Sequence, residues 1–331
     1  MKVQENQQVT CMLPFHQVVK SEFEEVNNLI VNRLDSEVEL IENIGQHIID
    51  GGGKRLRPLL VLLSANSCGY KGTEHIVLAA IIELIHTATL LHDDVVDTSE
   101  LRRGQATANI KYGNAPSVLV GDFLYSRAFQ MLIDVGNIEI MEIIAASTNI
   151  ISEGEVQQLI NARNPDISET EYKKVIFKKT AILFEAAAEI GALIAKSTSK
   201  QQAASSGYGR HIGMAFQLMD DVLDYDGDIK DLGKNIGDDF AEGKTTLPLI
   251  YAMKNGTKKQ SLMIQEAIKN ATFDKLDAIF DVIKITRALD YTKSCAHTHA
   301  LKAIQCLENL PDTKEKRAMI EIAKFSVERS F

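Results

Sequence analysis

The sequence predicts an all-α protein with one main domain. Glycine (20) and proline (6) are sparse for a chain of 331 residues, which is unlike a loop-rich β protein. Apolar residues instead recur at the spacing of one helix face, and a hydrophobic content of 45% is ample for a large core. No second domain boundary is visible. We therefore expect a loose N-terminal arm over residues 1–15 and a single domain over residues 16–331.

Bulk properties exclude several classes of protein. A net charge of −9 argues against a nucleic-acid partner. No uninterrupted apolar stretch approaches the ~18–20 residues that cross a bilayer, and the polar start Met1–Thr10 lacks the apolar segment of a signal peptide. No two cysteines form a Cys-x-x-Cys pair, as expected in a reduced cytosol. They are Cys11, Cys68, Cys295 and Cys306. These features predict a cytoplasmic protein without a transmembrane segment.

Helical patterning follows the arm and continues to the end of the chain. Its first break is the loop Gly51–Pro58, where glycines free the backbone and the proline restarts a helix at its first turn. Thr73 is expected to cap a long apolar helix, while Ser168–Glu171 and Thr257–Gln260 have the spacing of capping boxes. The expected helices span about 26–34, 38–48, 58–67, 73 to the first aspartates, 117–135, 138–161, 168–196 and 200–225, with polar loops at 101–116 and 226–243 and amphipathic helices after 247.

The long apolar helix ends in three carboxylates, Asp93, Asp94 and Asp97. At about 100° per residue, Asp97 lies ~40° from Asp93, so both side chains point the same way. Two acids one turn apart repel each other unless a cation bridges them, and hard oxygen ligands on a rigid helix suit Mg²⁺ bound to a phosphate. A single cluster of this kind is more often a solvated helix end.

A second acidic cluster follows another apolar stretch, 127 positions later. It contains Asp220, Asp221 and Asp224, and the region 220–242 holds nine acids against two lysines. Such a concentration of carboxylates attracts cations. Two copies of the same arrangement favour two facing walls of one metal–phosphate site.

Basic residues gather beside these acids. Each one alone is more often a solvated surface charge, but their grouping around two acidic clusters favours phosphate binding. They are Lys54, Arg57, Arg102, Arg103, Lys179, Lys234 and Lys244. His86, two helical turns before Asp93, is either a core histidine or a further phosphate contact.

Two other patterns do not support a site. Gly53-Lys54 and Gly243-Lys244 lack the glycine and hydroxyl spacing of a P-loop, so no nucleotide cradle is expected. His297 and His299 resemble metal ligands near Cys295, but residues two apart on a helix point in different directions.

Together these motifs resemble the trans-isoprenyl diphosphate synthases, the polyprenyl diphosphate synthase family, over nearly the whole chain. The matching segments are 52–58, 85–88, 93–97, 102–104, 179–180, 216–224 and 233–239. Residues 154–159 and 179–188 are particularly similar to bacterial octaprenyl diphosphate synthases. Thr245 departs from the family pattern, in which a proline is common there, and we expect little consequence.

The resemblance implies a fold, a cofactor and partners. The fold is a bundle of about ten core helices around a central cavity, and the assembly is a homodimer. The cofactor is Mg²⁺, with about three ions in each site. The reaction condenses isopentenyl diphosphate onto an allylic diphosphate, here farnesyl diphosphate, to give octaprenyl diphosphate of about forty carbons for a respiratory quinone such as ubiquinone.

The resemblance also implies residue roles. Asp93, Asp97 and Asp220 hold the metal ions, with Asp94, Asp221 and Asp224 in support. The allylic diphosphate is bound by Arg102, Lys179, Lys234 and Lys244, and isopentenyl diphosphate by Lys54, Arg57, His86 and Arg103. Thr180 and Gln217 lie beside the developing allylic cation.

Product length is expected to depend on Ala88 and Thr89. At ~1.5 Å per residue they lie ~6–7.5 Å below Asp93, where short-chain relatives carry bulky aromatics. Small residues there leave a tunnel open, with a deeper floor near Phe129, Met131 and Leu132. Other product lengths (C35, C45 or C50) and a subunit of a two-chain synthase are the alternatives. A terpene cyclase or a simple cation binder explains the paired clusters and their basic neighbours less well.

Overall fold

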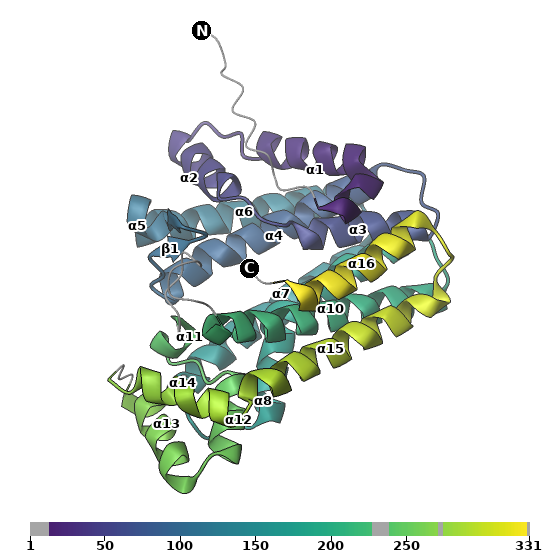
Figure 1. The fold of residues 1–331 in the computed structure, drawn as a ribbon. Helices are drawn as coiled ribbons and strands as arrows, with labels where there is room; N and C mark the ends of the chain where they lie inside the picture. The colour runs from purple at the N-terminus through teal and green to yellow at the C-terminus, as the bar shows by residue number, and fades with distance from the viewer. Residues whose placement is uncertain (1–12, 227–237, 271–273, 330–331) are drawn as a thin grey trace.

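The computed structural model describes residues 13–226, 238–270 and 274–329, and this part of the chain is almost entirely helical (Figure 1). The prediction of an all-α fold is confirmed. The N-terminal half forms η1 (Pro14–Val19), α1 (Lys20–Asn32), α2 (Glu39–Asp50), α3 (Leu56–Ser67), α4 (Glu74–Val96), β1 (Leu101–Arg102), β2 (Gln105–Ala106), α5 (Ala108–Tyr112), α6 (Asn114–Val135) and α7 (Ile138–Asn161).

The C-terminal half continues the bundle with longer helices. It forms α8 (Glu169–Ile176), η2 (Phe177–Ala181), α9 (Ile182–Ile194), α10 (Ser199–Asp226), α11 (Asp238–Ala241), α12 (Leu247–Asn255), α13 (Lys258–Asn270), α14 (Leu276–Ile285), α15 (Ala288–Cys306), η3 (Leu307–Asn309) and α16 (Lys314–Glu328). Successive neighbours α6, α4, α3, α9, α10 and α15 pack side by side across the molecule, and α12, α13 and α14 form a smaller layer at one end (Figure 1).

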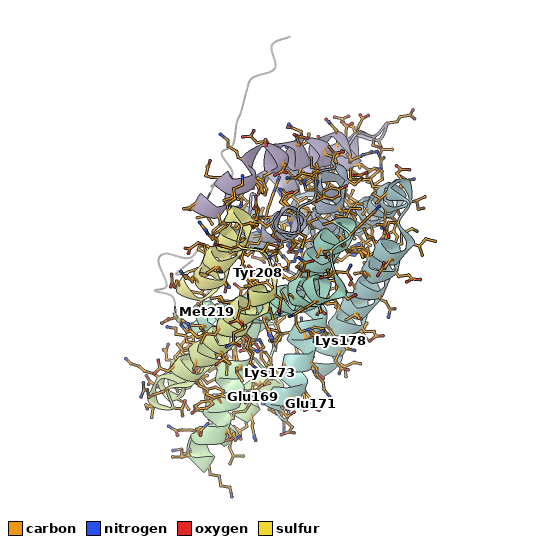
Figure 2. The ribbon with its side chains drawn as sticks, turned by 90° about the vertical axis from the view of Figure 1, so that its right-hand side faces the viewer. Glu169, Glu171, Lys173, Lys178, Tyr208 and Met219 are labelled. Atoms are coloured by element: carbon orange, nitrogen blue, oxygen red, sulfur yellow. The ribbon has the colours of Figure 1, made fainter. Side chains whose placement is uncertain are left out.

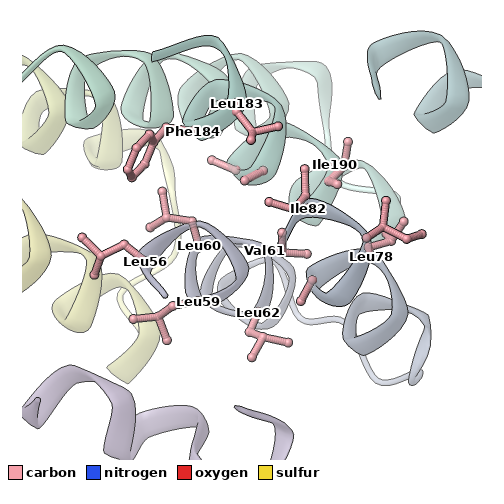
Figure 3. Close-up of a cluster of buried hydrophobic side chains, with 14 of the residues drawn as sticks. Leu56, Leu59, Leu60, Val61, Leu62, Leu78, Ile82, Leu183, Phe184 and Ile190 are labelled. Atoms are coloured by element: carbon pink, nitrogen blue, oxygen red, sulfur yellow. The ribbon is translucent and has the colours of Figure 1, made fainter. Parts of the chain in front are cut away.

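The main core lies where α3, α4 and α9 meet (Figure 3). Leu60 and Val61 on α3, Ile82 on α4 and Ile190 on α9 are fully buried there. Helix α4 has the length and apolar character of a membrane span, but most of it is buried inside the protein, as expected for the central helix of a bundle. Burial of this helix fixes the position of the aspartates at its end.

Helices α8 and α9 form the single long helix expected from the capping box at Ser168, and that capping box is confirmed. Glu169 in the first turn pairs with Lys173 one turn later at 2.6 Å (Figure 2). The helix is interrupted by one π turn, η2, which the apolar pattern does not reveal. A β-carbon on Gly213 would lie 2.5 Å from Cα of Ala181, and one on Gly154 would lie 2.8 Å from Cβ of Lys178, so glycines let α10 and α7 pack directly against this turn.

Several boundaries differ from expectation. Phe15 is buried in the main core and η1 begins at Pro14, so the packed chain starts before residue 16. The region 101–116 contains a short hairpin, α5 and the start of α6 rather than an unbroken loop. Thr73 precedes α4, but its side chain makes no cap hydrogen bond. The second capping box is present, since Thr257 and Gln260 exchange hydrogen bonds.

Candidate active site

Two acidic clusters lie at the C-terminal ends of α4 and α10. Asp93 is in the last turn of α4 with Asp97 as its C-cap, and Asp220 and Asp224 are in the last two turns of α10. A helix C-terminus already carries partial negative charge, so carboxylates at this position are destabilising without nearby cations. The structure supplies those cations from other segments.

Lysines from two different segments bind the first cluster. Lys179 Nζ lies 3.7 Å from an Asp93 carboxylate oxygen, and Lys244 Nζ lies 3.0 Å from Asp97. Burial raises the pKa of Asp93, the neighbouring Asp97 adds to that rise, and Lys179 opposes it. Burial alone lowers the pKa of Lys179, but Asp93 and Glu155 outweigh it and raise the pKa of the ammonium. Burial also lowers the pKa of Lys244, but Asp239, Asp97 and Glu242 outweigh it and raise the pKa, so both lysines are charged at neutral pH.

The same two lysines also line a cavity that reaches the second cluster. This cavity, of about 630 Å³ with its open mouth included, is bordered by Asp221, Thr180 and Gln217 as well as Lys179 and Lys244. The cavity thus lies between the π turn, α10 and the segment before α12, and its two lysines pair with the aspartates at the end of α4. That both acidic clusters belong to one site remains a prediction.

Two of the six aspartates are almost fully buried and accept hydrogen bonds from neighbouring side chains. Asp94 is 1% exposed and accepts hydrogen bonds from Nη2 and Nε of Arg102 at 2.7 and 3.1 Å. Asp221 accepts from the hydroxyl of Tyr172 and from Gln217 Nε2, the latter at 3.1 Å. Burial, and then the charge of Asp239, raise the pKa of Asp221 to about 8. These two carboxylates orient neighbouring groups in this structure.

Thr180 and Gln217 meet directly beside this network. The hydroxyl of Thr180 donates to Gln217 Oε1 at 2.9 Å, so the amide of Gln217 links the π turn to Asp221. Both side chains border the cavity, where an allylic cation is expected. Lys234, which is expected to bind the allylic diphosphate, falls outside the described residues.

A second group of basic residues lies around the glycine loop. Arg57 Nη1 donates to His86 Nε2 at 3.0 Å and its guanidinium stacks 4.2 Å from the centre of the Phe184 ring. Burial lowers the pKa of His86 well below its ordinary value, and Arg57 lowers it further, so the imidazole is a neutral acceptor. Burial also lowers the pKa of Arg57 to about 10, which leaves it charged at neutral pH.

The glycine loop itself brings Arg103 into this group. A β-carbon on Gly53 would lie 2.7 Å from Arg103 Nη1, and Gly53 has φ of +148°, so only glycine fits beside the guanidinium. Lys54 lies with its Nζ 5.0 Å from the centre of the Phe325 ring on α16. Glu83 on α4 faces this basic group from below, with Arg55 Nε 3.8 Å from its carboxylate.

The positions expected to control product length lie on α4 below the first cluster. Ala88 is fully buried in the main core, and Thr89 is half-buried with its hydroxyl donating to the carbonyl of His86 at 2.7 Å. Met131 and Leu132 are buried on α6, the helix packed against α4, and Phe129 is partly buried there. Their effect on product length remains a prediction.

The donor types suit a hard divalent cation, but among the described residues no three acidic, histidine or cysteine side chains are grouped closely enough to hold one. Carboxylate oxygens from Asp93, Asp97 and Asp220 are supplied by rigid helices, and no sulfur or imidazole ligand accompanies them among the residues described at this site. In this structure each of the three carboxylates pairs with a cationic side chain. A Mg²⁺ ion bound to a diphosphate would satisfy the same negative charge.

Sequence reasoning missed several residues of the site. Glu155 accepts from Lys179 at 2.7 Å, and its place in the motif 154–159 was an available signal. Tyr172 is buried against Asp221, and no local pattern indicates this because the two are 49 positions apart. Arg329, near the chain end, pairs with Asp220 at 2.7 Å and belongs to no motif.

Comparison with known proteins agrees with this geometry. The family model for polyprenyl synthetase matches residues 38–285. An octaprenyl diphosphate synthase from Escherichia coli is 48% identical over 92% of this chain and 94% of its own length. A geranyl-diphosphate-specific nonaprenyl diphosphate synthase from Rhodobacter capsulatus is 41% identical over 94% of this chain and 96% of its own.

Solved structures give the same result. A polyprenyl synthase from Caulobacter crescentus, crystallised with calcium and isoprenyl diphosphate, superposes with a TM-score of 0.92 at 41% identity and covers 96% of this chain and 97% of its own. A decaprenyl diphosphate synthase from Rhodobacter capsulatus gives 0.91 at 41% identity, with 96% and 98% covered. The chain belongs to the polyprenyl synthetase family of prenyltransferases.

Proposed function

We propose that the protein is a long-chain trans-polyprenyl diphosphate synthase that adds isopentenyl diphosphate units to an allylic diphosphate, with farnesyl diphosphate as starter, and makes octaprenyl diphosphate. The observation that carries this proposal is that Lys179 and Lys244 pair with the first aspartate cluster and also line a cavity bordered by Asp221 of the second. A separate basic group lies around Arg57. The octaprenyl relatives at 48% identity support a product of about eight isoprene units. Nonaprenyl and decaprenyl diphosphate are the alternative products, because synthases of these lengths are 41% identical to this chain.

The first step breaks the allylic C–O bond, and the leaving diphosphate carries several negative charges. Mg²⁺ bound by Asp93, Asp97 and Asp220 supplies Lewis-acid neutralisation of that charge. Lys179 and Lys244 border the same cavity and are placed to contact the diphosphate oxygens, as Arg102 is beside Asp94. In this assignment Lys179 and Lys244 leave Asp93 and Asp97 and bind the diphosphate of the allylic substrate instead.

The second step joins the allylic cation to the double bond of isopentenyl diphosphate. Arg57, Arg103, Lys54 and neutral His86 are proposed to hold the diphosphate of this second substrate. Thr180 Oγ1 and Gln217 Oε1 present oxygens beside the developing cation. A new C–C bond forms, a proton leaves the adjacent carbon, and the departing diphosphate accepts it. No side-chain nucleophile is needed, but the cavity has to exclude water.

A homodimer and a cytoplasmic location belong to the proposal. Six large apolar side chains on α6 and α7 are more than half exposed, and a second copy of the chain would cover them. They are Leu119, Ile133, Ile138, Val156, Leu159 and Ile160. The described cysteines Cys68, Cys295 and Cys306 are free, which fits a reducing compartment.

Light scattering tests the dimer. The wild-type chain of 36.6 kDa is expected to give twice its mass, and Leu159→Glu, which places a charge on the apolar face, is expected to raise the monomer fraction at micromolar concentration. A monomeric wild-type protein with full activity would remove the dimer from the proposal. An active, purified single chain would also exclude the two-chain alternative.

Product analysis tests the reaction and its metal site. With farnesyl diphosphate, isopentenyl diphosphate and Mg²⁺, the wild-type protein should form an octaprenyl product by mass spectrometry, and chelator should abolish turnover. Asp93→Ala and Asp220→Ala should each lower kcat by about a thousandfold because leaving-group neutralisation is lost. Asp290→Ala, at an exposed ion pair on α15, is the matched control. Full activity of Asp93→Ala in metal-free buffer would contradict the metal assignment.

The two diphosphate subsites can be separated kinetically. Arg57→Ala should mainly raise KM for isopentenyl diphosphate, since Arg57 belongs to the basic group at the glycine loop. Lys179→Ala should mainly lower the rate of allylic ionisation, measured in single turnovers. Lys178→Ala is the matched control, because this neighbour on the same π turn pairs with Glu153 and is about one-third exposed (Figure 2). If both variants affected both substrates equally, the assignment of Arg57 and Lys179 to separate diphosphate subsites would be wrong.

The tunnel position can be tested by added bulk. Ala88→Tyr is expected to block the growing tail about one or two isoprene units below the metals and to give a product of about three or four units. Overpacking a core costs about 1–3 kcal/mol, so a melting curve has to accompany the product masses. Ala88→Val is the milder companion and should shorten the product less. A folded Ala88→Tyr that still makes the full-length product would show that the tail does not pass Ala88.

A further inference from the structure

The last described residue, Arg329, returns from the end of α16 to the second aspartate cluster. Its Nη2 lies 2.7 Å from Asp220 Oδ1 and donates to the carbonyl of Phe216 at 2.6 Å. The guanidinium carbon lies 3.7 Å from the centre of the Phe216 ring. The arginine side chain is only 4% exposed, so this ion pair is almost fully buried on the arginine side.

Burial of this guanidinium is incompletely compensated. Arg329 Nε is buried and has no hydrogen-bond partner among the described residues. A buried donor without a partner adds to the free-energy cost of burying the guanidinium. At the acidic cluster, the ion pair with Asp220 is the main interaction that offsets this cost. Arg329 therefore depends on Asp220 more than Asp220 depends on it, since the carboxylate is 41% exposed and can be solvated.

Asp220 is also the first aspartate of the second cluster, and this inference rests on its proposed role as a metal ligand. A guanidinium 2.7 Å from Oδ1 and a divalent cation at the same oxygen exclude each other by space and by charge repulsion. We propose that Arg329 is a positioning residue that holds Asp220 in the metal-free protein and competes with the divalent cation, so that metal binding releases the end of α16.

The release is confined to the chain end. The body of α16 packs on α3, α10 and α15, and the hydroxyl of Tyr208 on α10 donates to the carbonyl of Met319 at 2.7 Å. Both groups are buried, and they anchor the helix whether or not Arg329 is bound. The coupling is reciprocal. If the cation weakens the contact between Arg329 and Asp220, then Arg329 weakens the binding of the cation by the same factor.

A purely structural role makes the opposite prediction. If Arg329 only closes the end of α16 and packs on Phe216, its removal disturbs the wall that carries Asp220. Metal affinity then falls or stays constant. Competition predicts that removal strengthens metal binding.

Mn²⁺ binding measured by electron paramagnetic resonance, with and without inorganic diphosphate, distinguishes the two. Competition predicts that Arg329→Gln lowers the Kd for Mn²⁺ by about tenfold, the scale of a lost charge-assisted hydrogen bond. Arg329→Lys keeps the positive charge but loses the planar guanidinium, so its Kd for Mn²⁺ should lie between those of wild type and Arg329→Gln. Arg317→Gln removes the same charge from an exposed position on α16 and should match wild type. An unchanged or raised Kd for Arg329→Gln overturns the proposal.

Chemical modification reports the arginine itself. Phenylglyoxal labelling of Arg329, read by mass spectrometry, should be slow in metal-free protein and should speed up at least about tenfold in saturating Mn²⁺. Arg317, which is 71% exposed, is the internal reference and should label rapidly in both states. Protection of Arg329 that persists in saturating Mn²⁺ contradicts release.

The outcomes separate this inference from the proposed function. A wild-type protein that binds no Mn²⁺, with or without diphosphate, would refute the metal site and with it this inference. A wild-type protein that binds Mn²⁺ through Asp93 and Asp220, with an affinity that Arg329→Gln does not raise, would leave the proposed function standing and remove only the role of Arg329.

Discussion

Repulsion among carboxylates at two helix ends is the constraint on which the site depends. Helices α4 and α10 both finish in aspartates where their own dipoles are already negative. Lys179 comes from the π turn, Lys244 from the chain before α12, and Arg329 from the end of α16. The fold therefore has to bring distant segments together before the two acidic helix ends can lie close to one cavity.

This constraint explains how far the sequence could predict the molecule. Apolar periodicity and capping boxes were sufficient for the order of the helices, because each is a local property. The two aspartate clusters were found because they are repeated and local. The grouping of Lys179 and Lys244 with them was predicted from their positions in motifs, and the observed ion pairs agree with it.

What the sequence did not predict depends on contacts between distant segments. Tyr172 reaches Asp221 across 49 positions, and Arg329 reaches Phe216 across 113. The π turn also escaped notice, since one additional residue in a helical turn leaves the apolar pattern on either side nearly intact. The start of the packed chain at Pro14 was missed because Phe15 is a single apolar residue in a polar segment.

The π turn has a consequence for the direction of Lys179. Over Phe177–Ala181 the backbone hydrogen bonds join residues five apart, as from the Ile182 N–H to the Phe177 carbonyl, where those of an α-helix join residues four apart. Lys179 and Thr180 face the cavity while α8 and α9 both keep their apolar faces in the core. Loss of one residue from this turn would restore regular winding and rotate one flank by about 100° relative to the other. The chain could then bury its apolar faces or direct Lys179 and Thr180 into the cavity, but not both. The number of residues in this turn is therefore as strictly constrained as their identity.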